Sequence, residues 1–331
     1  MDTVPLDPLL LKDLGEIGLL QRLRPFCQRV GDDGAILDPL SGQVVVTTDV
    51  LVDGVHFSDL TTPAFAVGYR AAAANLSDLA AMGSLPVGMV VGLGLPRDTP
   101  VVWIEELYQG LNACAEPWGM PIVGGDLCRA AQRFISITAL GQVQPGRAIE
   151  RHRAQVGDYL VVTGSHGSSR AGLALLQDPQ GWSQQFQQWD PGQIEHLIKT
   201  HQYPQPRLDV LPLLASFDRV AGMDTSDGLA DALVQICAAS GVDARVDACR
   251  IPMDQGLRLI FPDQALEWAL YGGEDFELLL SLPPAHAHSL AAALPGSAVI
   301  GEVVPASGDP GVVEVIGWGW LDRAQGFAHF S

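Results

Sequence analysis

The sequence predicts a two-domain protein of the α/β (α+β) class. A β-branched run at 44–52 precedes an alanine-rich helical pattern at 64–83, and an apolar run at 86–96 precedes an amphipathic pattern at 102–119. Further strand-like runs occupy 120–126 and 133–143. At 331 residues, 47% of them hydrophobic, the chain is long enough to give each of two domains a core.

A second alternating series follows the arginine-rich stretch 146–158. Its strand-like runs are 158–164, 276–283 and 297–303, and its helical patterns are 168–177, 228–240 and 285–294. We therefore place the boundary near residues 147–157 and assign residues 1–150 and 151–331 to the two domains. The glutamine-rich stretch 178–193, which contains Pro and Gly, is interpreted as a surface insertion.

Charge and composition restrict the possible partners. The net charge is −19, from 38 acidic and 19 basic residues, so nucleic acid and anionic membranes are not expected to bind. We find no signal peptide and no apolar run of about 18 residues, which favours a cytoplasmic protein. The five cysteines are scattered without a CxxC pair, which is typical of buried free thiols rather than disulfides or zinc.

The usual nucleotide-binding motifs are absent. Lys12 and Lys199 are the only lysines, and neither lies in a glycine-rich loop. No P-loop occurs, and GLGLPR at 92–97 has arginine where a dinucleotide fingerprint has its third glycine. The segment GSHGSSRAGLALL at 164–176 has two interpretations, a phosphate site at a helix N-terminus or a plain strand-to-helix turn.

Acids flanked by small residues recur where apolar segments end. They occur in GDD (31–33), TTD (47–49), NLSD (75–78), GGD (124–126), DTSDG (224–228) and GGED (272–275). Taken singly, NLSD and DTSDG are also typical of helix N-caps. The other loops, taken singly, are typical of turns. Together, oxygen ligands without paired Cys or His favour Mg²⁺, which commonly completes its coordination shell with water and substrate phosphates. This combination points toward ATP.

These motifs resemble those of the thiamine-monophosphate kinase family, in the superfamily of aminoimidazole ribonucleotide synthetase. The resemblance covers residues from about 31 to 330 and rests on GDDGAIL, TTDVLVDGVHF, NLSDLAAMG, VGGD, GRAIER, VTG, AGLALL, DTSDGL, YGGEDFELL and GFAHF. It implies a homodimer whose N-terminal domains share a β-barrel, a C-terminal α/β domain, and ATP bound between the domains. The implied reaction transfers the γ-phosphoryl group of ATP to thiamine monophosphate with several Mg²⁺ ions.

The resemblance also implies roles for matching positions. The implied metal ligands are Asp33, Thr47, Thr48, Asp49, Asp78, Asp126, Asp224 and Asp227, the ATP contacts are Gly125, Asp126, Arg151 and Ser226, and the thiamine contacts are His56, Glu274 and Phe327. From the residues alone, a partly buried structural histidine is the favoured explanation of His56, and a ligand contact is the alternative.

Two positions depart from the family pattern. Ser168 stands where relatives often have Asp, and Phe327 stands where they often have Tyr. Phenylalanine keeps the ability to stack on an aromatic ring but lacks the hydroxyl. The alternatives are another ATP-dependent enzyme of the superfamily, such as a ribonucleotide cyclo-ligase, and an inactive regulator that binds Mg-nucleotide.

Overall fold

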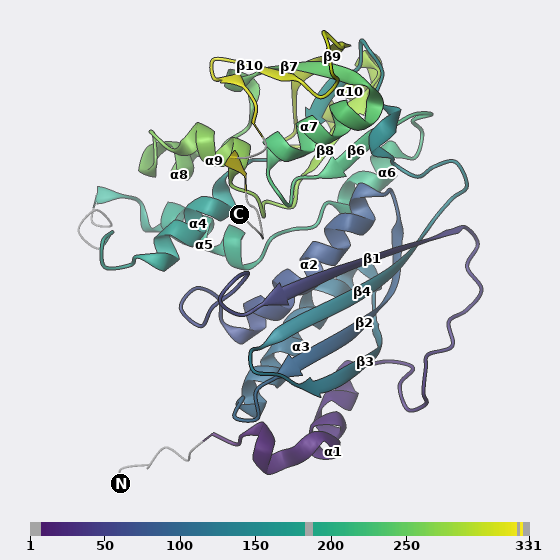
Figure 1. Ribbon diagram of the computed structural model, residues 1–331, viewed down its shortest axis with the longest axis vertical. Helices are drawn as coiled ribbons and strands as arrows, with labels where there is room; N and C mark the ends of the chain where they lie inside the picture. The colour runs from purple at the N-terminus through teal and green to yellow at the C-terminus, as the bar shows by residue number, and fades with distance from the viewer. Residues whose placement is uncertain (1–7, 183–187, 323–324, 327–331) are drawn as a thin grey trace. The chain divides into compact units, whose positions relative to one another are not determined.

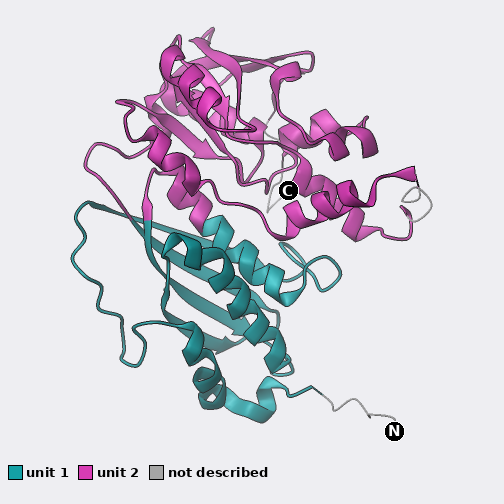
Figure 2. Ribbon diagram, turned by 180° about the vertical axis from the view of Figure 1, so that it is seen from behind, with its two compact units in different colours: residues 1–75, 86–141 teal, residues 76–85, 142–331 magenta. Residues whose placement is uncertain are grey.

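The structure, a computed structural model, describes residues 8–182, 188–322 and 325–326 (Figure 1). The chain divides into two compact units (Figure 2). Unit 1 comprises residues 1–75 and 86–141, and unit 2 comprises residues 76–85 and 142–331. In the described part of the chain, no helix is long and apolar enough to cross a membrane.

Unit 1 is built on a four-stranded sheet in the order β1-β4-β2-β3. Its elements are α1 (Leu11–Leu23), β1 (Gln43–Val52), α2 (Ala64–Ala81), β2 (Leu85–Leu95), α3 (Val101–Ala115), β3 (Ile122–Arg129) and β4 (Phe134–Val143), where the last residues of α2 and the first of β2 belong to unit 2. The four strands form an open sheet with β1 and β3 at its edges (Figure 1).

Two glycines let α2 and α3 approach each other closely. A Cβ atom on Gly68 would lie 1.9 Å from the carbonyl oxygen of Leu107, and one on Gly110 would lie 1.9 Å from that of Phe65. Because no side chain fits at these distances, glycine is required on both helices. The contact therefore fixes the helical layer that covers one face of the sheet (Figure 1).

The edge strand β1 exposes apolar side chains. Val44, Val46 and Val50 are 56%, 60% and 48% exposed, while the intervening Val45, Thr47 and Asp49 are half-buried. This alternation follows from the two-residue period of a strand. One face of β1 is therefore packed, and the opposite face presents valines.

Unit 2 contains a mixed seven-stranded sheet in the order β11-β10-β7-β9-β5-β8-β6. The strands are β5 (Tyr159–Val162), β6 (Ala221–Asp224), β7 (Val242–Asp247), β8 (Leu278–Leu282), β9 (Ala298–Pro305), β10 (Val313–Ile316) and β11 (Gly319–Trp320). The helices are α4 (Ser168–Gln177), α5 (Pro191–Gln202), α6 (Leu211–Leu214), α7 (Leu229–Ser240), α8 (Gln255–Ile260), α9 (Ala265–Tyr271) and α10 (Pro284–Ala293).

Helices cover the centre of this sheet. Every residue of β8 is buried, and since successive side chains point to opposite faces, both faces of β8 are covered. Helix α7 packs on β6 and β7, and α10 packs on β5, β8 and β9. The main core joins Leu160 and Leu279 of the sheet to Leu233 of α7.

A smaller core lies beneath α4, α5, α8 and α9. It is centred on Leu175, Leu197 and Phe261, with Trp182 and Trp268 packed against it. The stretch interpreted as a surface insertion spans 178–193, and its residues 183–187 lie outside the described residues.

The predicted α/β fold class and the alternation of elements are confirmed. The cysteine interpretation is only partly right. All five thiols are free, but Cys128 and Cys249 are exposed, while Cys114 and Cys237 are buried. Scattering along the sequence indicates the absence of pairing but carries little information about burial.

Candidate functional site

Strand register brings three of the predicted motifs together in unit 2. Asp224, the last residue of β6, pairs with Leu278 at the start of β8, and Val162 at the end of β5 pairs with Leu279. The loops that carry VTG, DTSDG and GGED therefore meet at one end of the sheet. Antiparallel pairing requires this, because the end of β5 or β6 lies beside the beginning of β8.

Asp224 is the most enclosed of the predicted metal ligands, at 4% exposed. Its Oδ2 accepts a hydrogen bond from the Ser77 hydroxyl at 2.9 Å, and its Oδ1 accepts one from the Ser226 hydroxyl at 3.1 Å. Small hydroxyl side chains thus hold the carboxylate of a strand end. Ser77 is a contact that the sequence interpretation missed, although it lies within NLSD.

The GGED loop lies against the same segment. The Glu274 amide donates to the Ser226 carbonyl at 2.7 Å, so Asp224, Ser226 and Glu274 are brought together. Glu274 is half-buried and has a left-handed backbone, with φ of 58°. Asp227 is exposed in the adjoining loop.

The N-cap explanation of NLSD and DTSDG is wrong. NLSD lies within the last turns of α2, and Asp78 is half-buried there. The N-cap residue of α7 is Gly228, which makes no side-chain cap. Neither motif caps a helix N-terminus with an Asp or Ser side chain, and the hydroxyls of Ser77 and Ser226 bind Asp224 instead.

Arg151 lies on a short 3₁₀ segment, Arg151–Arg153, beside α7. Its Nη1 donates to Gln235 Oε1 at 2.6 Å. The side chain is exposed, and its described partner is neutral. The hydrogen bond thus joins the Arg151 guanidinium to a neutral amide group.

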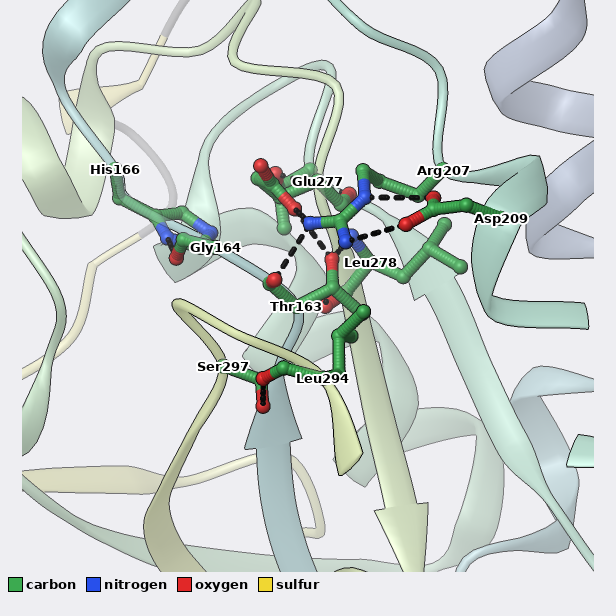
Figure 3. Close-up of polar contacts among 10 residues, drawn as sticks. Thr163, Gly164, His166, Arg207, Asp209, Glu277, Leu278, Leu294 and Ser297 are labelled. Carbon is green, nitrogen blue, oxygen red and sulfur yellow. Dashed lines mark hydrogen bonds and ion pairs between the residues drawn. The ribbon is translucent and has the colours of Figure 1, made fainter. Parts of the chain in front are cut away.

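A second carboxylate, that of the half-buried Glu277, is anchored by a cation (Figure 3). Arg207 Nη1 donates to Glu277 Oε2 at 2.6 Å, and the Thr163 hydroxyl donates to the same oxygen. Burial raises the pKa of Glu277 even though the charge of Arg207 opposes this effect. Arg207 also donates to Asp209 at 3.0 Å. Periodicity did not indicate this network, because Arg207 and Glu277 are far apart in the sequence.

The two interpretations of the segment 164–176 can now be separated. The amides of Gly167 and Ser169, at the start of α4, donate to the carboxylate oxygens of Asp275 at 2.6 and 2.9 Å. A protein carboxylate therefore occupies the helix N-terminus where phosphate binding was one possibility. Ser168, the position that departs from the family, is buried, and its hydroxyl has no hydrogen-bond partner.

In unit 1, TTD lies on β1 and GGD on β3. The Thr48 hydroxyl donates to the Ile137 carbonyl of β4 at 2.8 Å, and Asp49 is half-buried. Gly125 lies where a Cβ would be 2.3 Å from the carbonyl oxygen of Val91. Asp126 is exposed. Because β1 and β3 are opposite edges of the sheet, these two motifs are not adjacent.

The remaining predicted contacts include Asp33 and His56 in unit 1. Asp33 lies in an exposed loop before β1. His56 follows β1 in a turn, and its Nδ1 accepts a hydrogen bond from the Val52 amide at 3.0 Å, which places the proton of a neutral ring on Nε2. Phe327 lies outside the described residues.

The predicted metal ligands are divided between the two units. Across the described ranges, no three His, Cys, Asp or Glu side chains converge to hold a metal ion. Unit 1 carries Asp33, Thr47, Thr48, Asp49 and Asp126, and unit 2 carries Asp78, Asp224 and Asp227. As a donor set they offer only hydroxyl and carboxylate oxygens, which fit Mg²⁺.

A cavity of about 430 Å³ in unit 2 contains none of these predicted contacts. Its walls are largely apolar, including Ile149, Leu214 and Phe217, with Arg147 and Arg153 also in the lining. The Arg147 guanidinium is already engaged, because it donates to the Phe217 carbonyl at 2.9 Å.

Comparison with known proteins identifies the class. Residues 31–143 match the family model for the N-terminal domain of AIR synthase related protein, and residues 155–313 match the model for its C-terminal domain. Together with the two α/β units, these matches define an AIR synthase related protein. Within this class, relatives that are 48% and 38% identical and are named thiamine-monophosphate kinase show that the chain belongs to that family.

Individual relatives support this assignment. A curated thiamine-monophosphate kinase of Synechococcus elongatus is 48% identical over 88% of this chain and 90% of its own length. A crystal structure of thiamine-monophosphate kinase from Stenotrophomonas maltophilia is 35% identical, with a TM-score of 0.78, over 90% of this chain and 95% of that one. A structure of AaThiL complexed with AMPPCP and TMP is 31% identical, with a TM-score of 0.75, and the match covers 95% of this chain and 97% of that one.

His166 yields a prediction about pH. Its ring is buried with Nδ1 against the Gly164 carbonyl at 3.0 Å (Figure 3), and burial lowers its pKa from 6.5 to about 4. Between these values the unfolded chain binds one more proton, so the free energy of unfolding falls as pH falls from 6.5 to 4. We expect His166→Asn to reduce that slope by about 1.4 kcal/mol per pH unit, measured by urea unfolding.

The control is Leu197→Ala, which destabilises the same region without removing a titratable group. It should keep the wild-type slope. Equal slopes for His166→Asn and wild type would contradict the buried neutral histidine.

Proposed function

We propose that this protein is an ATP-dependent thiamine-monophosphate kinase, which transfers the γ-phosphoryl group of ATP to thiamine monophosphate and releases thiamine diphosphate and ADP. The observation that carries the proposal is 48% identity over 88% of the chain to a curated kinase of that name. The relative complexed with AMPPCP, a methylene analogue of ATP, and TMP supports the same pair of substrates.

The acceptor requires little activation. A phosphate monoester has a second pKa near 6, so at pH 7 its attacking oxygen mostly carries no proton. Transfer therefore needs no general base, and we assign none. The main barrier is repulsion between two polyanions. When bound, Mg²⁺ supplies the positive charge that lets two phosphate groups approach and align.

We assign Mg²⁺ coordination to hydroxyl and carboxylate oxygens. The proposed ligands are Asp33, Thr47, Thr48, Asp49, Asp78, Asp126, Asp224 and Asp227. In unit 2, the hydroxyls of Ser77 and Ser226 hold the Asp224 carboxylate in one orientation. Such hydrogen bonds reduce the freedom of a carboxylate that serves as a ligand.

The remaining assignments follow charge and shape. Gly125, Asp126, Arg151 and Ser226 are proposed to contact ATP, where the Arg151 guanidinium offers planar charged donors to a phosphate. His56, Glu274 and Phe327 are proposed to contact thiamine monophosphate. The thiazolium ring of thiamine is cationic, so the Glu274 carboxylate complements its charge, and the Phe327 ring is suited to stack on it.

The architecture also supports a homodimer. We propose that the exposed valines of β1 face a second copy, and that the sheets of both copies close into one β-barrel. A barrel has no free edge, so closure pairs the edge strands β1 and β3 and covers apolar surface.

Residues 1–150 would then form the N-terminal domain of each subunit and residues 151–331 the C-terminal domain. We assign the enzyme to the cytoplasm, where its free thiols remain reduced.

The substrate assay is the direct test. Purified protein with Mg²⁺, ATP and thiamine monophosphate is expected to form thiamine diphosphate, which is measured by chromatography. Adding a chelator is expected to abolish turnover while the protein stays folded. Formation of aminoimidazole ribonucleotide from its formylglycinamidine precursor instead would identify a cyclo-ligase. Binding of Mg-nucleotide without any turnover would identify a regulator.

Asp49→Asn tests a ligand on β1. The amide keeps the size of the carboxylate but lacks its charge, so we expect kcat to fall by about a hundredfold or more with little change in Tm. The control is Asp98→Asn, an exposed acid after β2 in the same unit. Wild-type kcat in Asp49→Asn would remove this residue from the metal site, and a large loss of Tm would indicate a structural role.

Val46→Lys tests the dimer surface. Val46 is 60% exposed in one subunit, so the monomer tolerates lysine there. In the proposed interface, however, the lysine ammonium group would be buried. We expect sedimentation velocity to show subunits that dissociate at concentrations where wild type remains dimeric. Val102→Lys on α3, where the valine is 52% exposed, is the matched control and should leave the dimer intact.

A further inference from the structure

The loop between α9 and β8, residues 272–277, has an unusual backbone. Gly273, Glu274 and Phe276 have φ angles of 65°, 58° and 53°. Glycine adopts this left-handed region readily, but Glu and Phe do so at a cost in free energy. Such conformations persist only where the surrounding structure holds them in place.

Asp275 lies between the two left-handed residues that are not glycine. Its side chain reaches the N-terminus of α4, where its Oδ2 accepts from the Gly167 amide at 2.6 Å and its Oδ1 accepts from the Ser169 amide at 2.9 Å. The residue is only 8% exposed. Both carboxylate oxygens are thus used to tie the loop to a helix that lies more than a hundred residues earlier in the chain.

Two backbone contacts hold the opposite side of the loop. The Glu274 amide donates to the Ser226 carbonyl at 2.7 Å, and the Thr225 amide donates to the Glu277 carbonyl at 2.8 Å. The loop is therefore fixed between the DTSDG segment and α4. Asp275 is the member of GGED that makes the connection to α4.

We propose that Asp275 is a positioning residue for Glu274: by binding the N-terminus of α4 it holds the left-handed loop in the form that presents Glu274 to the thiamine substrate. This inference rests on the proposed function, because it takes Glu274 as the substrate contact. The two adjacent acids then have separate roles. Glu274 contacts the substrate, and Asp275 maintains the backbone conformation of the loop that carries Glu274.

A carboxylate is the side chain that suits this position. It offers two acceptor oxygens to two amide donors, whereas asparagine offers one acceptor and an NH₂ group that itself donates. In Asp275→Asn one of the amides at Gly167 or Ser169 therefore loses its acceptor. An anion at a helix N-terminus is also favoured by the helix dipole.

An ordinary helix cap provides the matched control. Asp190 is the N-cap of α5, and its carboxylate accepts from the Gly192 amide at 3.0 Å. It is exposed and lies outside the GGED loop. Asp190→Asn thus alters a carboxylate cap in unit 2 without altering the loop.

The experiment combines steady-state kinetics with amide hydrogen exchange on full-length wild type, Asp275→Asn and Asp190→Asn. In Asp275→Asn we expect the KM for thiamine monophosphate to rise on the order of tenfold while the KM for ATP stays within about twofold. Exchange across residues 272–277 should accelerate on the order of tenfold, because the loop loses its anchor. Asp190→Asn should leave both KM values and this exchange unchanged.

Each outcome decides the inference. Unchanged hydrogen exchange across residues 272–277 in Asp275→Asn overturns the inference. Faster exchange with an unchanged KM for thiamine monophosphate also overturns it, because Asp275 would then be only a structural helix cap. If Asp275→Asn does not fold, fast exchange of the Gly167 and Ser169 amides in wild type overturns it, and slow exchange supports the anchor. A wild-type enzyme that is inert toward thiamine monophosphate refutes the proposed function alone, and the exchange result still decides the anchor.

Discussion

Buried carboxylates need hydrogen-bond donors, and the organisation of unit 2 follows from how they are supplied. An ionised carboxyl group removed from water costs several kcal/mol unless donors or cations replace its hydration. Three buried acids in this unit and the half-buried Glu277 meet the requirement in different ways. Asp158 is bound by Arg219 and Ser281, Asp224 by Ser77 and Ser226, Asp275 by the α4 amides, and Glu277 by Arg207 and Thr163.

The type of donor matches the task of each acid. Burial raises the pKa of Asp158, but the hydrogen bonds from Arg219, Gln155 and Ser281 outweigh it, so the net pKa is lowered and the group is a stable structural anion. Asp275 has only neutral amides as its described donors, and burial raises its pKa to about 7. The hydroxyls of Ser77 and Ser226 orient the Asp224 carboxylate and supply no positive charge of their own. This arrangement suits an acid proposed to bind a cation.

Local pattern predicted most of the elements. The alternation of strand-like and helical runs located β1 to β5 and α2 to α4 closely, because burial imposes periods of two and 3.6 residues on the sequence. The same method gave the wrong explanation for NLSD, which lies inside α2 and whose Ser77 contacts Asp224. N-cap preferences are local, and they contain no information about a partner on a distant strand.

The sequence by itself determined the composition of the site: acids beside Gly, Ser and Thr, few lysines, and motifs shared with a kinase family. Only the tertiary structure decided which of these residues meet. The pairing of Asp224 with Leu278 brings DTSDG beside GGED, and the chain path across unit 1 separates TTD from GGD onto opposite sheet edges. The physical reason is that side-chain chemistry is encoded residue by residue. Strand register and sheet order, in contrast, arise from hydrogen bonds and packing between segments far apart in the chain.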